Sequence, residues 1–333
     1  MPFIGKPKVQ FILSVDTEEE WDWSGPFPDK NFSVNNVFEI PAFQLYCQEL
    51  GIKPTYLVDH AVSNNVDSAA ILRDLPRKHC EIGAHLHPWV NPPFTEKTTE
   101  FLSHVINLPI DLVEAKLVEL ISSIQTNIGV KPTSFRTGRW GINGAVIELL
   151  TKYEFEVDSS IYPLYHDDFF TCETAPIKQY YPSLANTNIH DENQKHNILE
   201  LPVSCGFNRS NYSLAQKMHR LFEKRPFSWL KINGVLWHTL LLRKLYLSPE
   251  LCTSKDMNRL IDNKLISGDT CFHMYLHSSS LLSDVTGLNN EINARENICQ
   301  RIGEVVHHLS HVADVEFVTL TEAKSKLTTM ENV

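Results

Sequence analysis

Acidic and histidine side chains stand in pairs at the ends of apolar runs, where they could bind a metal ion and move protons. Asp16 and Glu18 end the run VQFILSVDTE, and His85 and His87 end the run CEIGAHLH. His277 ends a third run, CFHMYLH. Carboxylates and imidazoles are common zinc ligands in hydrolytic enzymes, and a histidine outside the ligand set can act as a general acid.

The members of each pair are expected to converge because each run reads as a strand. Residues i and i+2 of a strand project to the same face, so Asp16 should lie beside Glu18, and His85 beside His87. By the same alternation Glu19 should face away. A lone acidic pair could also be a solvated loop, and an HxH pair could be held by hydrogen bonds alone. The C-terminal end of a buried strand is where α/β barrels assemble active sites, which favours a functional site.

The rest of the chain alternates strands with helices. Apolar strand-like runs begin at Val9, Pro54, Cys80, Ser134, Phe155, Ile198, Cys271 and Val315, and helical spacing covers 38–51, 67–79, 111–128, 145–153 and 290–312. Repeated strand–helix units with near-continuous apolar strands predict a parallel sheet covered by helices. Their number predicts an α/β fold, a distorted (β/α) barrel of about seven parallel strands with helical insertions. We expect residues 1–333 to form a single domain.

Bulk properties exclude several classes of protein. The net charge of −10 over 333 residues argues against nucleic acid as a partner. The 7 cysteines show no CxxC spacing, which favours a reducing compartment. The N-terminus lacks a signal-peptide core, and no apolar stretch is long enough to span a bilayer, so we expect a cytoplasmic protein. The sequence has no GxSxG, Walker, GxGxxG or HExxH motif, which removes the common serine-hydrolase, nucleotide-binding and zincin interpretations.

Two further polar residues end predicted strands. Arg136, in SFRTGRWG, could hold Asp16 ionised through a charge-assisted hydrogen bond, or could be an ordinary structural arginine. Asp158, in VDSSIYP, could orient a histidine or cap the loop that follows it. His273 lies deeper in its strand than His277, which is typical of a core histidine.

Two stretches interrupt the alternation of strands and helices. Residues 164–196 are polar and are predicted to form a loop. An insert at about 206–250 is predicted to be helical, and its segment 213–248 is basic although the protein as a whole is acidic. Its basic residues are Lys217, Arg220, Lys224, Arg225, Lys231, Arg243 and Lys244, against the single acidic residue Glu223. Such a segment either packs its apolar face on the barrel or contacts a membrane surface or an anionic ligand.

The order of SVDTEEEW, HCEIGAHLHPW, SFRTGRWG and FHMYLH resembles that of the polysaccharide deacetylases, carbohydrate esterases of the NodB-homology type. The resemblance runs from about residue 9 to residue 325 and implies a distorted (β/α) barrel. It implies that Asp16 is the catalytic base, held by Arg136, and that Glu18 and His85 bind the metal. It also implies that His277 protonates the leaving nitrogen.

The sequence departs from the pattern of that family in three places. Most members carry the second metal histidine four residues after the first, where this chain has Trp89, and His87 stands two residues after His85 instead. Most members use Asp where this chain has Glu18. The usual proline after the arginine is replaced by Thr137 and Gly138. We expect a site rebuilt around Glu18, His85 and His87, because HxH is itself a competent ligand pair.

These residues together predict a metal-dependent hydrolase that removes an N-acyl group, with zinc the expected ion. The expected substrate is an amino sugar of a small molecule or oligosaccharide, such as an intracellular glycan or sugar-nucleotide intermediate, acetyl being the expected acyl group. Trp89, Trp140 and Arg139 are the expected substrate-binding residues. Two alternatives remain open: an amide hydrolase acting on a non-sugar amide, imide or formamide, and a non-catalytic sugar-binding barrel.

Overall fold

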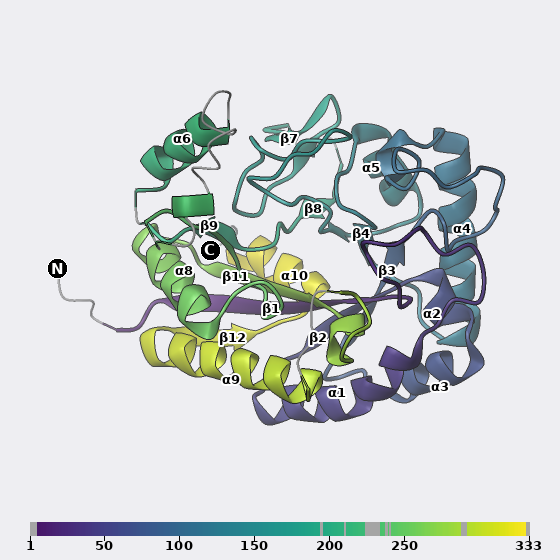
Figure 1. Cartoon of the computed structure of the whole chain (residues 1–333), viewed down its shortest axis with the longest axis horizontal. Coiled ribbons are helices and arrows are strands. Elements are labelled where there is room, and N and C mark those ends of the chain that lie inside the picture. Colours follow the sequence, from purple (N-terminus) through teal and green to yellow (C-terminus); the bar gives the residue numbers. More distant parts are fainter. Residues whose placement is uncertain are drawn as a thin grey trace.

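The computed structural model describes residues 5–193, 196–209, 211–223, 234–236, 239, 241–287 and 292–330. A parallel sheet forms its centre, with strand order β11-β1-β2-β3-β4-β5-β8, and β12 pairs with the first half of β1 (Figure 1). Its strands are β1 (Lys8–Thr17), β2 (Pro54–Val58), β3 (Glu81–Leu86), β4 (Ser134–Thr137), β5 (Val157–Asp158), β8 (Leu199–Glu200), β11 (Cys271–His277) and β12 (Asp314–Phe317). The central strands are almost wholly buried, which explains their continuous apolar runs.

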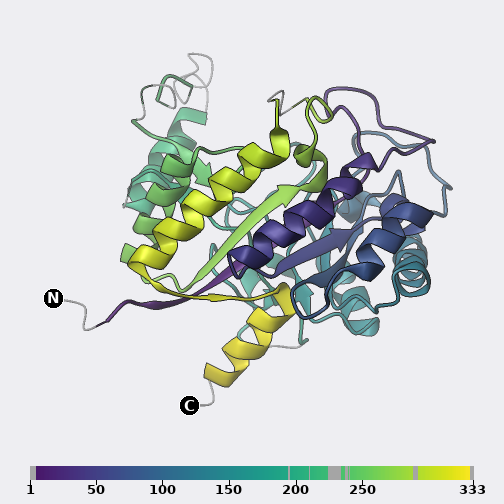
Figure 2. The same ribbon diagram turned by 90° about the horizontal axis from the view of Figure 1, so that it is seen from below.

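Most helices cover the outside of the sheet. The described helices are α1 (Ile40–Glu49), α2 (His60–Asn64), α3 (Val66–Asp74), α4 (Ile110–Asn127), α5 (Gly144–Lys152), α6 (Tyr212–Glu223), α8 (Ser254–Ile266), α9 (Ala294–Val312) and α10 (Leu320–Met330), with 3-10 turns at η1 (Asn35–Glu39), η2 (Val105–Asn107) and η4 (Ser278–Leu281). Helix α6 instead packs on the strand Cys205–Phe207, and α10 packs Leu320 and Ala323 against Ile12 and Leu57 at one end of the barrel. Figure 2 shows α9 and α1 lying across the outer face of β11, β1 and β2. None of the described helices combines the length and apolar character needed to cross a bilayer.

Irregular chain fills the gap between β8 and β11. The backbone N–H of Ser204 donates to His273 O at 2.9 Å, and Tyr275 N–H donates to Leu247 O at 3.1 Å. These two segments flank an antiparallel hairpin of β9 (Cys205–Phe207) and β10 (Lys244–Tyr246). The sheet therefore curls into the distorted barrel that the sequence predicts, with a short hairpin between its first and last strands.

The predicted insertions are only partly as expected. Residues 164–196 contain a hairpin of β6 (Pro182–Ser183) and β7 (Asn186–His190), so that stretch is not loop alone. The insert at 206–250 contains α6 but also β9 and β10, because its two ends pair with each other across the barrel gap. Of the seven basic residues in its segment 213–248, three have partners inside the protein, Lys217 is exposed, and three lie outside the described residues. The partnered ones are Arg220, Arg243 and Lys244, and those outside the described residues are Lys224, Arg225 and Lys231.

A pair of buried carboxyl groups lies where β5 and β8 are in register. Asp158 and Glu200 are opposite one another, and both side chains are fully buried. Asp158 Oδ1 accepts a hydrogen bond from Ser160 Oγ at 2.6 Å, and Glu200 Oε1 accepts one from Ile161 N at 3.2 Å. Burial, and next the neighbouring Asp158, raises the pKa of Glu200 well above its usual value. The folded protein therefore retains a proton on this pair that the unfolded chain releases above about pH 4.

Replacement of Glu200 by Gln should therefore stabilise the fold at high pH. Because the folded-state pKa is raised, stability that is complete below the unfolded pKa of about 4.3 declines as the pH rises. The amide in the Glu200→Gln variant would donate permanently to Asp158. The free energy of unfolding of the variant, relative to that of the native protein, should therefore rise by roughly 1–2 kcal/mol from pH 5 to pH 8. Urea unfolding at both pH values measures this gain, with the exposed Glu148→Gln variant as the control. An equal difference at pH 5 and pH 8 would contradict the shared proton.

Candidate active site

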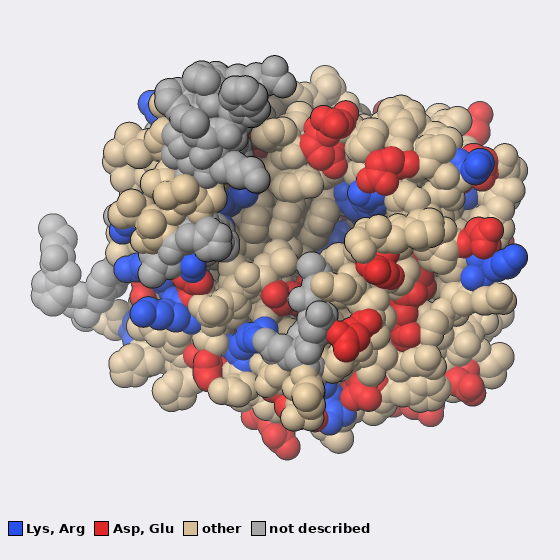
Figure 3. Space-filling model, viewed as in Figure 1, with Lys and Arg blue, Asp and Glu red and all other residues tan. Residues whose placement is uncertain are grey.

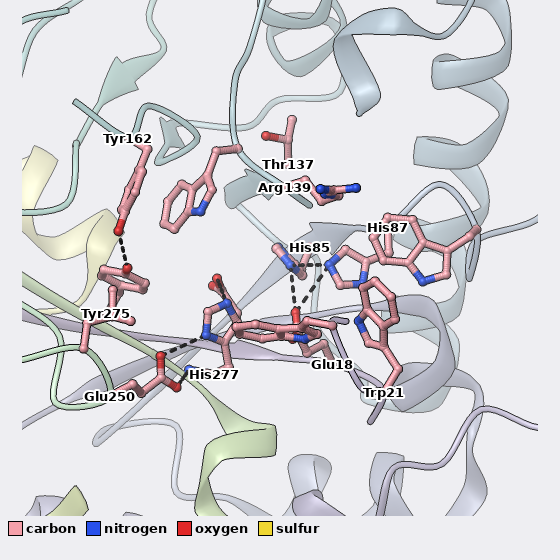
Figure 4. Close-up of a pocket in the computed structure, with 15 residues that line it drawn as sticks. Glu18, Trp21, His85, His87, Thr137, Arg139, Tyr162, Glu250, Tyr275 and His277 are labelled. Carbon is pink, nitrogen blue, oxygen red and sulfur yellow. Dashed lines mark hydrogen bonds and ion pairs between the residues drawn. The ribbon is translucent and has the colours of Figure 1, made fainter. Parts of the chain in front are cut away.

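A cleft opens over the C-terminal ends of the barrel strands, on the hollowed face of the molecule in Figure 3. Its volume is about 280 Å³. It is lined by Asp16, Glu18, Trp21, Trp23, His85, His87, Trp89, Thr137, Arg139, Trp140, Tyr162, Glu250, Leu251, Tyr275 and His277. Figure 4 shows these side chains pointing toward one another from both sides of the barrel. Of the predicted site residues, Arg136 and Asp158 are not among the lining groups.

The three predicted metal ligands meet at one point. His85 Nε2 and His87 Nε2 are 3.1 Å apart, and Glu18 Oε2 lies 3.3 Å from the first and 3.4 Å from the second. All three side chains are buried. A tetrahedral zinc site with bonds of about 2.0–2.1 Å separates its ligand atoms by roughly 3.3–3.4 Å, so these distances fit such an ion.

Hydrogen bonds on the far side of each ring strengthen that conclusion. His85 Nδ1 lies 3.2 Å from the carbonyl oxygen of Arg136, and His87 Nδ1 lies 2.9 Å from Glu19 Oε2. Both partners are acceptors, so each Nδ1 carries the proton and each Nε2 presents a lone pair. Two imidazole lone pairs and one carboxylate oxygen then face one another in a buried space. A cation between them would relieve the repulsion, and the donor set suits zinc with an open position for water.

Burial shapes the protonation of these ligands when no ion is bound. It raises the pKa of Glu18 well above the usual value, helped by the adjacent Glu19, and it lowers the pKa of His87 to about 4. Burial likewise lowers the pKa of His85 well below its ordinary value. The two histidines are therefore neutral at neutral pH, which is the form that binds a metal.

Asp16 and Arg136 form an ion pair across the interior of the barrel, from β1 to β4. Arg136 Nη1 donates to Asp16 Oδ1 at 2.5 Å, and its other nitrogens donate to Ser14 and to Ser159. Burial would raise the pKa of Asp16, but Arg136, with smaller contributions from His85 and His277, holds it below the usual value. Asp16 therefore remains an anion although it is almost completely buried, and its second oxygen faces His277 Nε2 at 3.7 Å.

Glu250 is the partner of His277, and the sequence analysis did not identify it. One oxygen of Glu250 accepts a hydrogen bond from the backbone N–H of His277 at 2.6 Å, and the other oxygen lies 3.0 Å from the ring nitrogen Nδ1. Burial lowers the pKa of His277, but Glu250 outweighs burial and leaves the pKa above the ordinary value. Asp158, which was considered for the role of orienting a histidine, instead pairs with Glu200 and Ser160, because β5 directs its side chain away from the cleft.

Glu19 is a second residue whose place differs from expectation. It follows the last residue of β1, so strand alternation no longer governs it, and the prediction that it faces away from the site is wrong. Its fully buried carboxylate contacts the ring of His87 on the side opposite Glu18. Burial raises the pKa of Glu19 to about 7. By contrast, His273 is buried with both ring nitrogens partnered, by Ser14 Oγ and by Leu201 O, as befits a core histidine.

The predicted substrate-binding residues line the cleft, but two of them are already stacked. The ring of Trp89 packs on His87 at 4.3 Å, and the ring of Trp140 packs on Tyr162 at 4.5 Å. Arg139 and Trp140 adopt left-handed backbone conformations, each with φ near 62°, which turns both side chains toward the cleft. Such strained backbone is frequent at binding sites. Trp21 and Trp23, on the loop after β1, are only partly buried and offer more open faces.

Comparison with known proteins supports the fold. Neither a family model nor a curated protein matches this sequence. The chain is similar in structure to a protein from Parabacteroides distasonis assigned as a glycoside hydrolase or deacetylase, with a TM-score of 0.60, 12% identity and coverage of 96% and 71% of the two chains. It is also similar to a protein from Mycobacterium smegmatis assigned as a polysaccharide deacetylase, with a TM-score of 0.55, 12% identity and coverage of 99% and 94%.

A third similar structure is that of Puue allantoinase, with a TM-score of 0.51, 12% identity and coverage of 97% and 91%. At these identities the likeness concerns the fold alone. The resemblance to polysaccharide deacetylases seen in the sequence is thus confirmed as a likeness of fold, that of a distorted (β/α) barrel.

The contact between Glu250 and His277 predicts how this histidine titrates. Glu250→Gln removes the anion that favours the imidazolium, so the pKa of His277 should fall. An NMR titration of the His277 ring measures the change without any substrate. The exposed variant Asp262→Asn, which removes the carboxylate beside His308, should leave His277 unaffected. An unchanged titration of His277 in Glu250→Gln would show that Glu250 does not set its charge.

Proposed function

We propose that this protein is a metal-dependent hydrolase that removes an N-acyl group, acetyl being the first candidate, from an amino sugar. The observation that carries the proposal is one cleft that holds three converging metal-ligand atoms, an ionised carboxylate and a paired histidine. That set contains each group that amide hydrolysis requires, which favours an enzyme over a sugar-binding barrel without activity. The fold shared with proteins assigned as deacetylases is consistent with the proposal.

Glu18, His85 and His87 would hold the ion. When bound there, zinc would polarise the acyl carbonyl and acidify a water molecule. Asp16 is kept ionised by Arg136 and takes a proton from the attacking water. His277, whose protonated form Glu250 favours, donates a proton to the departing amine nitrogen. Asp16 and His277 thus act as base and acid from neighbouring strands, at positions that are in register.

Partly open aromatic faces in the cleft favour a sugar ring as substrate. Trp21 stacks on Phe27 at 5.0 Å, and Trp23 meets the edge of His277 at 4.7 Å. Aromatic rings of this kind bind the apolar faces of pyranoses, and Arg139 adds a hydrogen-bond donor at the same wall. The second candidate substrate is a non-sugar amide, imide or formamide. The structural likeness to an allantoinase supports this candidate. A panel of N-acetylated sugars and simple amides, with separate readouts for acetate, formate and ammonia, distinguishes the two.

Replacement of the proposed base tests the chemistry. Asp16→Asn keeps an oxygen that can accept from Arg136 but cannot take a proton, so turnover should fall by roughly 10²–10⁴-fold. Bound metal and the melting temperature, measured on the same sample, should stay close to the native values. The exposed variant Asp22→Asn on the neighbouring loop is the matched control. Near-native turnover in Asp16→Asn would mean that another group is the base.

Removal of a proposed ligand tests the metal. His87→Ala should abolish stoichiometric zinc in protein purified without chelator, measured by elemental analysis, because only two ligands remain. His308→Ala, on the surface helix α9, should retain the ion. Treatment of the native protein with a chelator should abolish hydrolysis, and added zinc should restore it. Stoichiometric zinc in His87→Ala would overturn the ligand assignment.

A further inference from the structure

The two nitrogens of His87 face different partners. Nδ1 is 2.9 Å from Glu19 Oε2, and Nε2 is 3.1 Å from His85 Nε2 and 3.4 Å from Glu18 Oε2. An ionised carboxylate can only accept, so the contact with ionised Glu19 places the ring proton on Nδ1. The Nε2 lone pair is then directed at the other two ligand atoms. The orientation of the ring as a ligand thus depends on Glu19.

Both carboxylate oxygens and the backbone N–H of Glu19 have hydrogen-bond partners. Its Oε1 accepts from Trp89 Nε1–H at 2.7 Å, so each carboxylate oxygen has one N–H donor. Its backbone N–H donates to Asp59 Oδ2 at 3.0 Å. The other oxygen of Asp59 accepts from Val62 N at 2.7 Å and caps the start of α2. A helix terminus, Asp59 and Glu19 therefore form one fully buried chain of contacts that ends on His87.

Packing fixes the ring of His87 as firmly as the hydrogen bonds do. Trp89 stacks on one face with an interplanar angle of 23°. Gly138, in the turn after β4, lies against the edge of the ring. A Cβ atom at Gly138 would be 2.0 Å from His87 Cδ2 and 2.8 Å from Nε2, closer than any real side chain permits. Only glycine at this position leaves room for the imidazole.

We propose that Glu19, anchored by Asp59, and Gly138 are positioning residues that make His87 a metal ligand. Glu19 sets the tautomer of the ring, and Gly138 provides the space that the ring occupies. Outer contacts of this kind typically change metal affinity about 10–100-fold. The proposal rests on the metal site of the proposed function, yet it concerns the protein's own residues and can be tested without substrate.

Glu19→Gln is the central variant. A Gln side chain has one acceptor oxygen for the two donors, His87 Nδ1–H and Trp89 Nε1–H, so one of them must face the amide nitrogen. The ring of His87 is then free to adopt the Nε2–H tautomer, which cannot bind a metal. We expect Zn²⁺ to bind roughly 10–100-fold more weakly, by competition with a chromophoric chelator. In the metal-free variant, ¹⁵N NMR should show the Nε2–H form that the native protein lacks.

A second substitution separates this effect from a general loss of structure. Trp89→Phe in the Glu19→Gln background removes the competing donor, so the Gln oxygen can accept from His87, and Zn²⁺ affinity should recover. Asp22→Asn removes a carboxylate from the same loop without touching His87, and its affinity should be native. Gly138→Ala should weaken Zn²⁺ binding at least as much as Glu19→Gln while Nδ1 remains protonated, because it displaces the ring without changing the acceptor.

Native affinity and a native tautomer in Glu19→Gln would overturn the proposal, and native affinity in Gly138→Ala would overturn the role of the glycine. The failure of the proposed function has a different signature. A native protein that binds Zn²⁺ tightly but hydrolyses no N-acyl compound would refute the enzyme and leave these roles intact. If the native protein binds no Zn²⁺, the tautomer measurement decides the role of Glu19 by itself.

Discussion

The buried guanidinium of Arg136 is the interaction on which the rest of the cleft depends. It reaches from β4 across the interior to Asp16 on β1, and its remaining donors are used by Ser14 of the same strand and by Ser159 just after β5. Its backbone carbonyl orients His85, and its guanidinium lies 4.8 Å from the ring centre of Trp140. One residue thus contacts the proposed base, a proposed metal ligand and an aromatic wall of the cleft. Loss of one partner of such a buried pair costs about 3–5 kcal/mol, so barrel and site are stabilised together.

The cleft carries more negative charge than a single arginine can offset. Asp16, Glu18, Glu19, Asp59 and Glu250 are all buried or nearly so around it. Two like charges 4 Å apart repel by about 4 kcal/mol at an effective dielectric constant of 20, and burial adds to this cost. The pKa of Glu18 is raised in response, so part of the strain is relieved by a proton. A divalent cation would relieve more, which explains why so acidic a cavity suits a metal better than an anionic ligand.

Strand periodicity was enough to predict the groups on the strands and those one residue beyond a strand end. The strand that ends at Thr17 and the one that ends at Leu86 bring Glu18 and His87 to the same rim as their partners, because parallel strands end together. Periodicity fails farther from the strand ends. Glu19 lies beyond its strand and turns back to His87, and Glu250 follows a hairpin whose pairing crosses the barrel gap. No local pattern links Glu250 to His277, since 27 residues separate them and only tertiary packing joins them.

The unusual spacing of the two histidines has a physical explanation in the residues around it. In the family that the sequence resembles, the second histidine stands where this chain has Trp89, and this tryptophan stacks on His87 and donates to the carboxylate of Glu19. The histidine nearer the strand needs space beside β4, and Gly138 supplies that space. Glu19, Trp89 and Gly138, from three separate segments of the chain, thus together accommodate the ring of His87. What this arrangement provides is the convergence of His87 Nε2 with His85 Nε2 and Glu18 Oε2, the geometry that the proposed metal site needs.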